Sequence, residues 1–402
     1  MEMLIESLWD RQKTNPELRK YNVAIITTTI NVPYFLESFI QNIDSCAIDY
    51  GKLVFIIIGD LKSPHDEIKR YIKKLNPSFV IEYWDIEHQK KWISKTFGKE
   101  GIEKIEFAIP YNSIRRRNLG YLRALELGSD VIVTIDDDNY PESSNWLLEH
   151  LNALYDNSTL PTVSSKNKII NPCRILKFNY PNLRIYSRGY PFSELFCDTF
   201  DVEFRSEGRV ALNLGLWTKS PDVDAYTNIL FPNLESLGIG DEFQKEYALA
   251  PNNYMPINTQ NTAFIRELTP AFYDVLMDTP ISGTRIDRYD DVWAGLFALK
   301  LIHKLNYRAT FGIPLTVHRR NKHDYISDLK SELVGMSLNN VVHKIVMNAD
   351  IQSKNFIDGY LELAHILVNE IRKFITDEET LSYFSRLTEA MKIWIDLVEV
   401  FE

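Results

Sequence analysis

The sequence predicts an α/β protein with a mostly parallel sheet, helices on both faces of the sheet and a helical appendage at its C-terminal end. Apolar, β-branched runs typical of doubly buried strands occur at Val23–Thr29, 53–58 and Val131–Ile135. Helical patterns separate these runs, and such alternation is typical of parallel sheets. From Ser327 onward the apolar spacing is helical, so we expect a body over residues 1–325 and a helical region over residues 326–402.

The elements at the start of the chain place polar residues at strand ends. A polar segment, expected to be helical, precedes the first strand, whose end is rich in hydroxyl groups and includes Thr28. The second strand stops at Gly59-Asp60. An acid there can accept hydrogen bonds from a ribose hydroxyl or a base N–H. A Gly-Asp pair is also a common turn, and a turn is the more frequent explanation.

The next elements are less regular. Helices are expected over residues 34–42 and 64–75, and a strand over residues 79–84. The stretch that follows, up to Lys104, is polar and shows no clear periodicity.

The strand expected over Val131–Ile135 ends in three adjacent acids, Asp136, Asp137 and Asp138. Open α/β sheets bind ligands outside the carboxyl ends of their strands. Adjacent carboxylates repel one another unless a cation or hydrogen-bond donors compensate them, and Mg²⁺ is commonly held by one or two carboxylates plus substrate phosphates. The alternative is a solvated turn whose aspartates cap the next helix.

Three consecutive arginines, Arg115 to Arg117, lie on a helix expected over residues 113–122, directly before the strand at Val131–Ile135. Such a run is usually a solvated face. Because the chain has a net charge of −10, we expect Arg117 instead to turn inward and bind phosphate with its guanidinium fork. No glycine-rich phosphate loop follows the first strand, which disfavours dinucleotide and P-loop sites and leaves a metal as the phosphate anchor.

Beyond Pro141 a helix at Trp146–Tyr155 is followed by short strands, prolines and aromatic clusters, which favours a pocket built from loops. Asp290 and Asp291 begin another helix; they either cap it or form a second carboxylate site facing the substrate. His318 ends a strand among cations. A lone histidine is more often structural than a ligand.

Composition and charge limit the kinds of partner and the cell compartment that we expect. The negative charge argues against nucleic acid, and no apolar run reaches membrane-spanning length. Cys46, Cys173 and Cys197 are not spaced as metal ligands are. This favours buried thiols in a reducing compartment. With no signal-peptide pattern, we expect a cytoplasmic protein. The C-terminal helices would pack on the body or on another subunit of a homo- or hetero-oligomer.

Several ordered motifs resemble the reversibly glycosylated polypeptides, which include the plant UDP-arabinopyranose mutases and are nucleotide-sugar glycosyltransferases of the GT-A fold. The matching segments are Thr134 to Asp138, Arg188-Gly189-Tyr190-Pro191-Phe192-Ser193, Gly215-Leu216-Trp217, Pro221-Asp222, Asp224-Ala225, Arg288-Tyr289-Asp290-Asp291-Val292-Trp293-Ala294-Gly295, Gly312-Ile313-Pro314 and His318. They run over roughly residues 105–400, and the RGYPFS and RYDDxWAG blocks are far more specific than a DxD. The resemblance implies a GT-A-like, Rossmann-type catalytic domain that binds a nucleotide sugar.

The resemblance also implies a site. A divalent cation, Mn²⁺ or Mg²⁺, would bridge the diphosphate of a UDP-sugar and stabilise the leaving UDP, with Asp136, Asp138 and His318 as its ligands. Arg188, Asp290 and Asp291 would be catalytic. The remaining nucleotide contacts would be Thr28, Asp60, Arg117, Asp136, Asp137 and Trp217.

In the mutases the arginine of the RGYPFS block is reported to carry the sugar transiently, and the equivalent residue here is Arg188. A guanidinium is a poor nucleophile, so the default physical role is a phosphate clamp; a covalent role needs a nearby carboxylate as base. Leu214 in place of a usual histidine, the residues after His318 and an insertion at residues 197–209 depart from the family. The sugar's identity therefore does not transfer.

Three functions follow. The leading hypothesis is an enzyme that interconverts the pyranose and furanose forms of a UDP-sugar. The second is a glycosyltransferase that passes the sugar to an acceptor or to itself. The third is a non-catalytic nucleotide-sugar-binding subunit of a larger complex.

Overall fold

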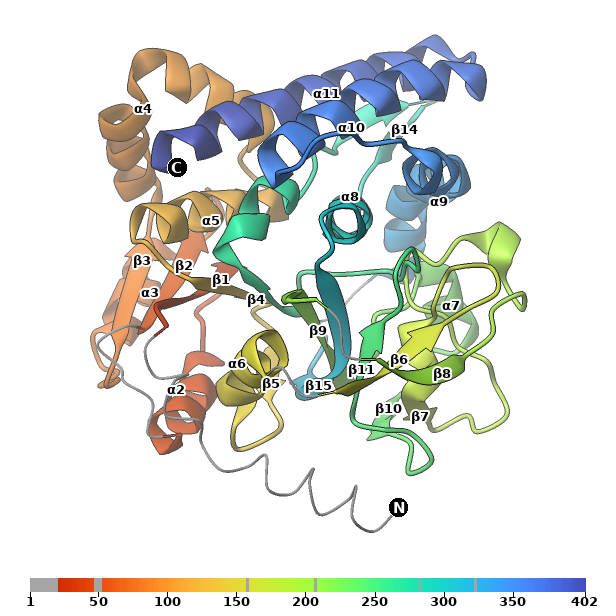
Figure 1. Ribbon diagram of the computed structural model, residues 1–402. Coiled ribbons are helices and arrows are strands. Elements are labelled where there is room, and N and C mark those ends of the chain that lie inside the picture. Colours follow the sequence, from red (N-terminus) through yellow and green to blue (C-terminus); the bar gives the residue numbers. More distant parts are fainter. Residues whose placement is uncertain (1–20, 47–52, 157–158, 206–207, 282, 322–323) are drawn as a thin grey trace.

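The computed structural model describes residues 21–46, 53–156, 159–205, 208–281, 283–321 and 324–402 (Figure 1). One thirteen-stranded sheet runs through these residues, with helices on both of its faces. A second sheet is the two-stranded hairpin of β13 (Thr279–Ile281) and β14 (Thr284–Ile286). The helix expected before Val23 lies outside the described residues.

Four strands form the parallel part of the large sheet, in the order β3-β2-β1-β4. Residue Val23 of β1 pairs with Leu53 of β2 on one side and with Val131 of β4 on the other. Since the three strands run in register, their carboxyl ends meet at one edge of the sheet. The strands are β1 (Val23–Thr29), β2 (Leu53–Gly59), β3 (Val80–Trp84) and β4 (Val131–Ile135).

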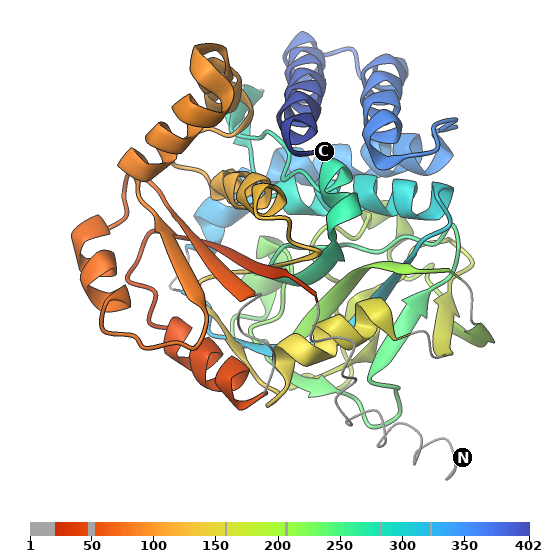
Figure 2. The ribbon, with the colours of Figure 1, turned by 60° about the vertical axis from the view of Figure 1, so that its left-hand side comes forward.

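Helices connect these strands and cover both faces of the sheet (Figures 1 and 2). They are α2 (Leu36–Ser45), α3 (His65–Ile72), α4 (Ile86–Ala108), the 3-10 helix η3 (Ile114–Arg116), α5 (Arg117–Glu126) and α6 (Trp146–Tyr155). The sequence pattern did not predict α4. Gly98 has a φ of 67° inside it and joins two helical pieces at a kink. Because the kink shifts the phase of the buried face, no single helical period runs through this stretch.

An antiparallel strand, β12 (Asn261–Ile265), joins the parallel part to the rest of the sheet by pairing with β4 and β9. Strand β15 also pairs with β5, with His318 opposite Asn139, so the end of β15 lies beside the chain that leaves β4. The remaining strands are β5 (Asn139–Pro141), β6 (Leu160–Ser164), β7 (Leu176–Phe178), β8 (Asp201–Arg205), β9 (Val210–Lys219), β10 (Ser236–Ile239), β11 (Glu246–Leu249) and β15 (Arg308–His318).

The C-terminal part of the chain is helical, as predicted. In both ribbon views α10 and α11 lie side by side across the top of the molecule, above α8 (Figures 1 and 2). Trp394 of α11 is fully buried and donates a hydrogen bond from Nε1 to the Pro270 carbonyl at 3.2 Å. The helices are α7 (Ala225–Leu230), α8 (Asp290–Lys304), α9 (Tyr325–Asn348), α10 (Phe356–Glu370) and α11 (Glu378–Val398).

The predicted α/β class, the sheet flanked by helices and the helical C-terminal region are confirmed. The expectation of buried thiols holds for Cys46 and Cys173 but is wrong for Cys197, which is exposed beside the edge strand β8. Within the described ranges, no helix combines the length and apolar character needed to cross a membrane.

Candidate functional site

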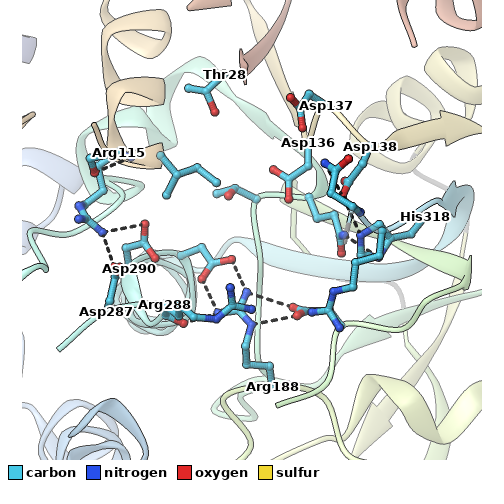
Figure 3. Close-up of a pocket in the computed structure, with 18 of the residues that line it drawn as sticks. Thr28, Arg115, Asp136, Asp137, Asp138, Arg188, Asp287, Arg288, Asp290 and His318 are labelled. Atoms are coloured by element: carbon cyan, nitrogen blue, oxygen red, sulfur yellow. Dashed lines mark hydrogen bonds and ion pairs between the residues drawn. The ribbon is translucent and has the colours of Figure 1, made fainter. Parts of the chain in front are cut away.

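A cavity of about 440 Å³ lies at the carboxyl edge of the parallel strands (Figure 3). The segment after β4, the start of α8 and the end of β15 contribute to its walls. Charged side chains of both signs dominate its lining. The lining residues are Thr28, Asn112, Ser113, Ile114, Arg115, Asp136, Asp137, Asp138, Arg188, Asp222, Thr259, Gln260, Asp278, Asp287, Arg288, Asp290, Asp291, His318, Arg320 and Asn321.

The three adjacent aspartates face the cavity, and each has a different partner. Asp136 accepts a hydrogen bond from the fully buried guanidinium of Arg117. Asp137 accepts one from the Thr29 hydroxyl at 2.7 Å. Asp138 Oδ2 lies 3.4 Å from His318 Nε2. The turn alternative, in which all three are solvated, does not describe this arrangement.

These partners give the three carboxyl groups different proton affinities. Burial raises the pKa of Asp137 to about 6, although the Thr29 hydroxyl opposes this effect. Burial likewise raises the pKa of Asp136, against the attraction of Arg117. For Asp138, burial is outweighed by its interactions with His318 and with the backbone N–H of Asn321, so its pKa is lowered. Asp138 therefore stays ionised to lower pH than its neighbours, as a metal ligand must.

The pair of Asp138 and His318 fits a divalent cation. His318 Nδ1 lies 2.7 Å from the Ser220 carbonyl oxygen. Since a carbonyl only accepts, Nδ1 donates to it, and Nε2 is the ring nitrogen that faces Asp138 and that a cation there would bind. A carboxylate and an imidazole nitrogen thus face each other across 3.4 Å. Such a pair suits a cation that takes its other ligands from phosphate and water.

No ready-made metal cage accompanies this pair: among the described residues, no group of three His, Cys, Asp or Glu side chains could hold a metal ion. Asp136 is engaged by Arg117 instead of facing His318. A cation at Asp138 and His318 would therefore depend on ligand oxygens for most of its coordination.

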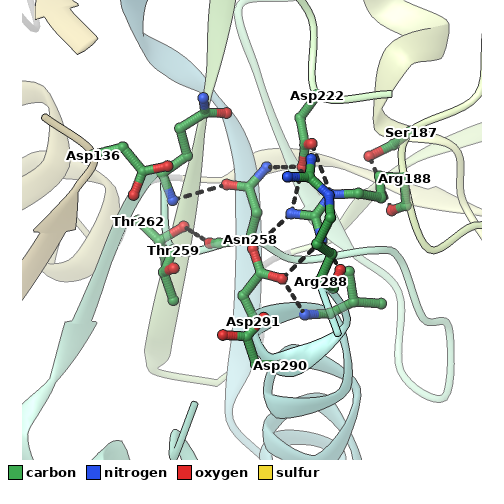
Figure 4. Close-up of polar contacts among 12 residues, drawn as sticks. Asp136, Ser187, Arg188, Asp222, Asn258, Thr259, Thr262, Arg288, Asp290 and Asp291 are labelled. Atoms are coloured by element: carbon green, nitrogen blue, oxygen red, sulfur yellow. Dashed lines mark hydrogen bonds and ion pairs between the residues drawn. The ribbon is translucent and has the colours of Figure 1, made fainter. Parts of the chain in front are cut away.

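Arg188 lies across the cavity, held between two carboxylates (Figure 4). Its Nε and Nη2 donate to Asp222 at 2.9 and 3.2 Å. Its Nη1 and Nη2 donate to Asp291 at 2.9 and 2.7 Å. A further bond from Nη1 to the Arg288 carbonyl engages the last of the five N–H groups. The Arg188 side chain is thus fixed in one orientation.

The charge state of this clamp follows from the same contacts. Burial alone lowers the pKa of Arg188, but Asp222 and Asp291 outweigh it and raise that pKa well above its ordinary value. In turn Arg188 outweighs burial at Asp222 and lowers the pKa of that carboxyl group. In this arrangement Arg188 is a cation with an anion on each side.

Asp290 is separated from this clamp although it neighbours Asp291. Its carboxylate lies 3.5 Å from Arg115, which also binds Asp287 at 2.9 Å. Burial raises the pKa of Asp290 to about 6, with Arg115 opposing and Asp291 adding to the shift. Of the two acids expected to serve Arg188, the structure brings only Asp291 into contact with it.

Three other expected nucleotide contacts are not among the lining residues. Asp60 is buried behind the cavity, where it accepts a hydrogen bond at 3.0 Å from the backbone N–H of Ser113, which does line it. Arg117 turned inward as expected, but toward Asp136 and Thr259. Trp217 is 2% exposed within β9 and packs in the core, so the structure does not bring it to the cavity. Thr28 does line the cavity.

The sequence interpretation missed Asp222 as a site residue. It follows the end of β9 by three residues and also accepts a hydrogen bond from Asn258 at 2.9 Å. Its place after a strand end and its Pro221-Asp222 motif were available signals. Arg115 and Asp287 were missed as well, because nothing local distinguishes a buried ion pair from a solvated one.

The fold and the cavity define an α/β protein with a charged ligand site at the carboxyl edge of its parallel strands, where this architecture binds nucleotides. A family model described as "Reversibly glycosylated polypeptide" matches residues 85–402, and the chain belongs to that family.

Relatives agree with this assignment. The chain is 27% identical over 277 residues to "Probable UDP-arabinopyranose mutase 4" of Arabidopsis thaliana, covering 67% of each chain. It is 28% identical over 274 residues to "UDP-arabinopyranose mutase 1" of Oryza sativa subsp. japonica, covering 66% of each. Against "UDP-arabinopyranose mutase 2" of Arabidopsis thaliana the match covers 53% of the relative. The matched part thus spans about half to two thirds of these curated relatives.

Solved structures are more distant. The mannosyltransferase PcManGT from Pyrobaculum calidifontis, in complex with GDP-Man and Mn²⁺, is 12% identical with a TM-score of 0.39, covering 99% of this chain and 93% of that one. Glucosyl-3-phosphoglycerate synthase from Mycobacterium tuberculosis is 13% identical with a TM-score of 0.36, covering 82% and 84%.

Proposed function

We propose that the chain binds a UDP-sugar in this cavity and interconverts the pyranose and furanose forms of the sugar. The observation that carries the proposal is the clamped Arg188. It comes from the RGYPFS block, one of the two segments that most specifically resemble a family whose named relatives are UDP-arabinopyranose mutases. It lies across the cavity from the aspartates that follow β4.

We assign the nucleotide to the edge formed by Thr28 and the loop at Asn112 to Ile114. Asp60 would support that loop through its bond to Ser113. Asp138 and His318 would hold Mn²⁺ or Mg²⁺, and Asp136, kept in place by Arg117, would lie beside the same phosphates. When bound, the cation supplies Lewis-acid stabilisation to the departing diphosphate.

The reaction needs no redox step and consumes no water. The bond between the anomeric carbon and the β-phosphate oxygen breaks, and its electron pair stays on that oxygen, giving UDP. A nitrogen of Arg188, its proton passed to Asp291 or Asp222, would bond to the anomeric carbon, and its electron pair would let the ring C–O bond open with the proton going to the ring oxygen. A different hydroxyl then closes the ring on that carbon, and the β-phosphate oxygen of UDP displaces the nitrogen, which restores the C–O bond. Charge therefore develops twice, once on the phosphate and once at the sugar.

Arg188 and its carboxylates suit the sugar side of this reaction. Held as a cation, Arg188 keeps Asp222 and Asp291 in place, so that their oxygens can accept hydrogen bonds from sugar hydroxyls and Asp291 can stabilise positive charge at the anomeric carbon. If Arg188 itself attacks that carbon, it must first give a proton to Asp291 or Asp222, both within hydrogen-bond distance. Asp290, paired with Arg115, would lie on the same side as an acid whose charge changes near pH 6.

One experiment tests the proposal. The purified protein is incubated with Mn²⁺ and a panel of UDP-sugars, and both the nucleotide pool and the intact protein mass are followed. A new UDP-furanose supports the mutase. A persistent sugar adduct on the protein, or UDP release only with an added acceptor, would instead support the glycosyltransferase. Binding without turnover of any sugar would contradict both and leave a nucleotide-sugar-binding subunit.

A further inference from the structure

Three of the four arginines that line the cavity are each shared between two carboxylates. These pairs neutralise them, so they have little charge left for an anionic ligand. The pairs are Arg115 with Asp287 and Asp290, Arg188 with Asp222 and Asp291, and Arg288 with Asp328 and Glu332.

Arg320 differs from these three. Within the described part of the chain, its Nη1 is buried and has no hydrogen-bond partner; Arg115 Nε also has none, but Arg115 Nη1 already lies beside two carboxylates. The Arg320 guanidinium lies over the Tyr325 ring, with its central carbon 5.7 Å from the ring centroid. A buried guanidinium nitrogen without an acceptor is costly, which marks a position prepared for an anion.

Asp138 holds the backbone on both sides of Arg320.

 Both sequence neighbours of Arg320 donate backbone hydrogen bonds to Asp138. Arg319 donates its backbone N–H to the Asp138 carbonyl at 2.9 Å, and Asn321 donates its own to Asp138 Oδ2 at 3.3 Å. Arg320 lines the same cavity as the Asp138–His318 pair and the Arg188 clamp.

We propose that Arg320 binds the β-phosphate of the nucleotide diphosphate. This inference rests on the proposed function and adds a residue to it. A diphosphate that reaches from the nucleotide edge at Thr28 past Asp138 and His318 toward Arg188 brings its second phosphate to Arg320. A guanidinium matches phosphate with paired N–H donors.

This position gives Arg320 a chemical role. When the bond between the anomeric carbon and the β-phosphate oxygen breaks, the electron pair remains on that oxygen. Arg320 then faces an anion with more charge than the intact donor, so it stabilises the departing UDP more than the bound UDP-sugar.

The test measures dissociation constants of UDP, UMP and uridine in the presence of Mg²⁺, by calorimetry, for the wild type and three variants. In Arg320→Ala the affinity for UDP falls about ten- to a hundredfold, while the affinities for UMP and uridine change less than about twofold. Arg320→Lys keeps the charge without the fork and gives an intermediate loss. The matched control is Arg319→Ala, since the Arg319 side chain is exposed and stacks on Tyr140 at 4.5 Å.

The outcomes distinguish the role of Arg320 from the proposed function. If Arg320→Ala and Arg320→Lys both bind UDP as tightly as the wild type, the role of Arg320 is refuted and the proposed function stands. An equal loss of UDP and UMP would refute the assignment to the β-phosphate. A wild type that binds neither UDP nor any UDP-sugar refutes the proposed function itself.

Discussion

Single carboxyl groups in this site differ in charge because their partners differ. Asp136, Asp137 and Asp138 are adjacent in sequence but pair with a guanidinium, a hydroxyl and an imidazole. Their pKa values are accordingly raised for the first two and lowered for the third. At residue scale, Asp138 is the acid best suited to a cation.

Asp138→Asn should weaken UDP binding that depends on Mn²⁺ by at least about tenfold, because the ion loses its ionised oxygen ligand. The measurement compares UDP titrations with and without Mn²⁺ for both proteins. UDP binding without the metal should change little. Unchanged metal-dependent affinity would remove Asp138 from the metal site.

Arg188→Lys should lower turnover by about 10²- to 10³-fold while UDP affinity stays within a few fold. Lysine keeps the positive charge between Asp222 and Asp291 but offers three donors in place of five. Arg188→Ala is less informative, because two buried carboxylates without their cation would cost about 3–5 kcal/mol of stability. Full activity in Arg188→Lys would exclude a role that needs the guanidinium.

Asp290 should make stability depend on pH. Its pKa in the folded state is about 6, against an ordinary value of 3.8. Between these values the folded state holds a proton that the unfolded state has released, so the free energy of unfolding falls as pH rises through this window. At pH values above about 6, the decrease that Asp290 causes in the free energy of unfolding is complete.

Asp290→Asn removes this titration. We expect the stability of the variant relative to the wild type to increase by about 1–3 kcal/mol from pH 4 to pH 7, measured by urea unfolding at each pH. A difference that is constant with pH would mean that Asp290 titrates normally. Comparison with the wild type at each pH cancels the titration of other groups.

At the scale of elements, the site depends on how the RGYPFS segment meets the first turn of α8. Gly189 has a φ of 85°, and a Cβ added to it would lie 2.3 Å from Cγ1 of Val292 in that turn. Only glycine allows both the backbone conformation and the close approach. The same contact sets Arg188 against Asp291.

Gly189→Ala should therefore separate the segment from α8. We expect a loss of about 1–3 kcal/mol in the free energy of unfolding and a lower turnover with each UDP-sugar that the wild type accepts. Gly128→Ala is the matched control, since Gly128 also has a positive φ, 66°, but no atom within 4 Å of the added Cβ. Equal effects of the two substitutions would reduce the role of Gly189 to backbone strain alone.

At the scale of the whole molecule, the C-terminal helices complete the core instead of standing apart from it. Buried residues of α10 and α11 belong to the same apolar cluster as the central strands. Tyr383 of α11 also donates a hydrogen bond to the Leu276 carbonyl at 3.0 Å. The boundary at residues 325 and 326, the oligomeric state and the cytoplasmic location stay predictions.

Trp394→Ala tests whether the helical region folds separately. The cavity it leaves should cost about 3–5 kcal/mol. We expect one cooperative unfolding transition, shifted as a whole, when it is followed by both circular dichroism and tryptophan fluorescence. The exposed Lys392 on the same helix offers Lys392→Ala as the control. Two separate transitions, with one of them unshifted, would identify residues 326–402 as an independent unit.

The sequence by itself determined the elements whose burial pattern is local. Strands buried on both faces are continuous apolar runs, and the helix at Asp290 begins where the sequence predicted. It also determined that three acids follow β4. Where the period breaks, as at the kink of α4, the local pattern was uninformative.

Tertiary structure decided which charges meet. Arg188 pairs with Asp222 and Asp291, which are 34 and 103 residues away along the chain. Arg117 faces Asp136 because α5 packs on β1 and β2, and β1 pairs with β4, while Trp217 is buried in the core. Pairing across such distances depends on strand order and register, which burial patterns of single segments do not encode. The type of site was therefore readable from the sequence, but the partner of each charge was not.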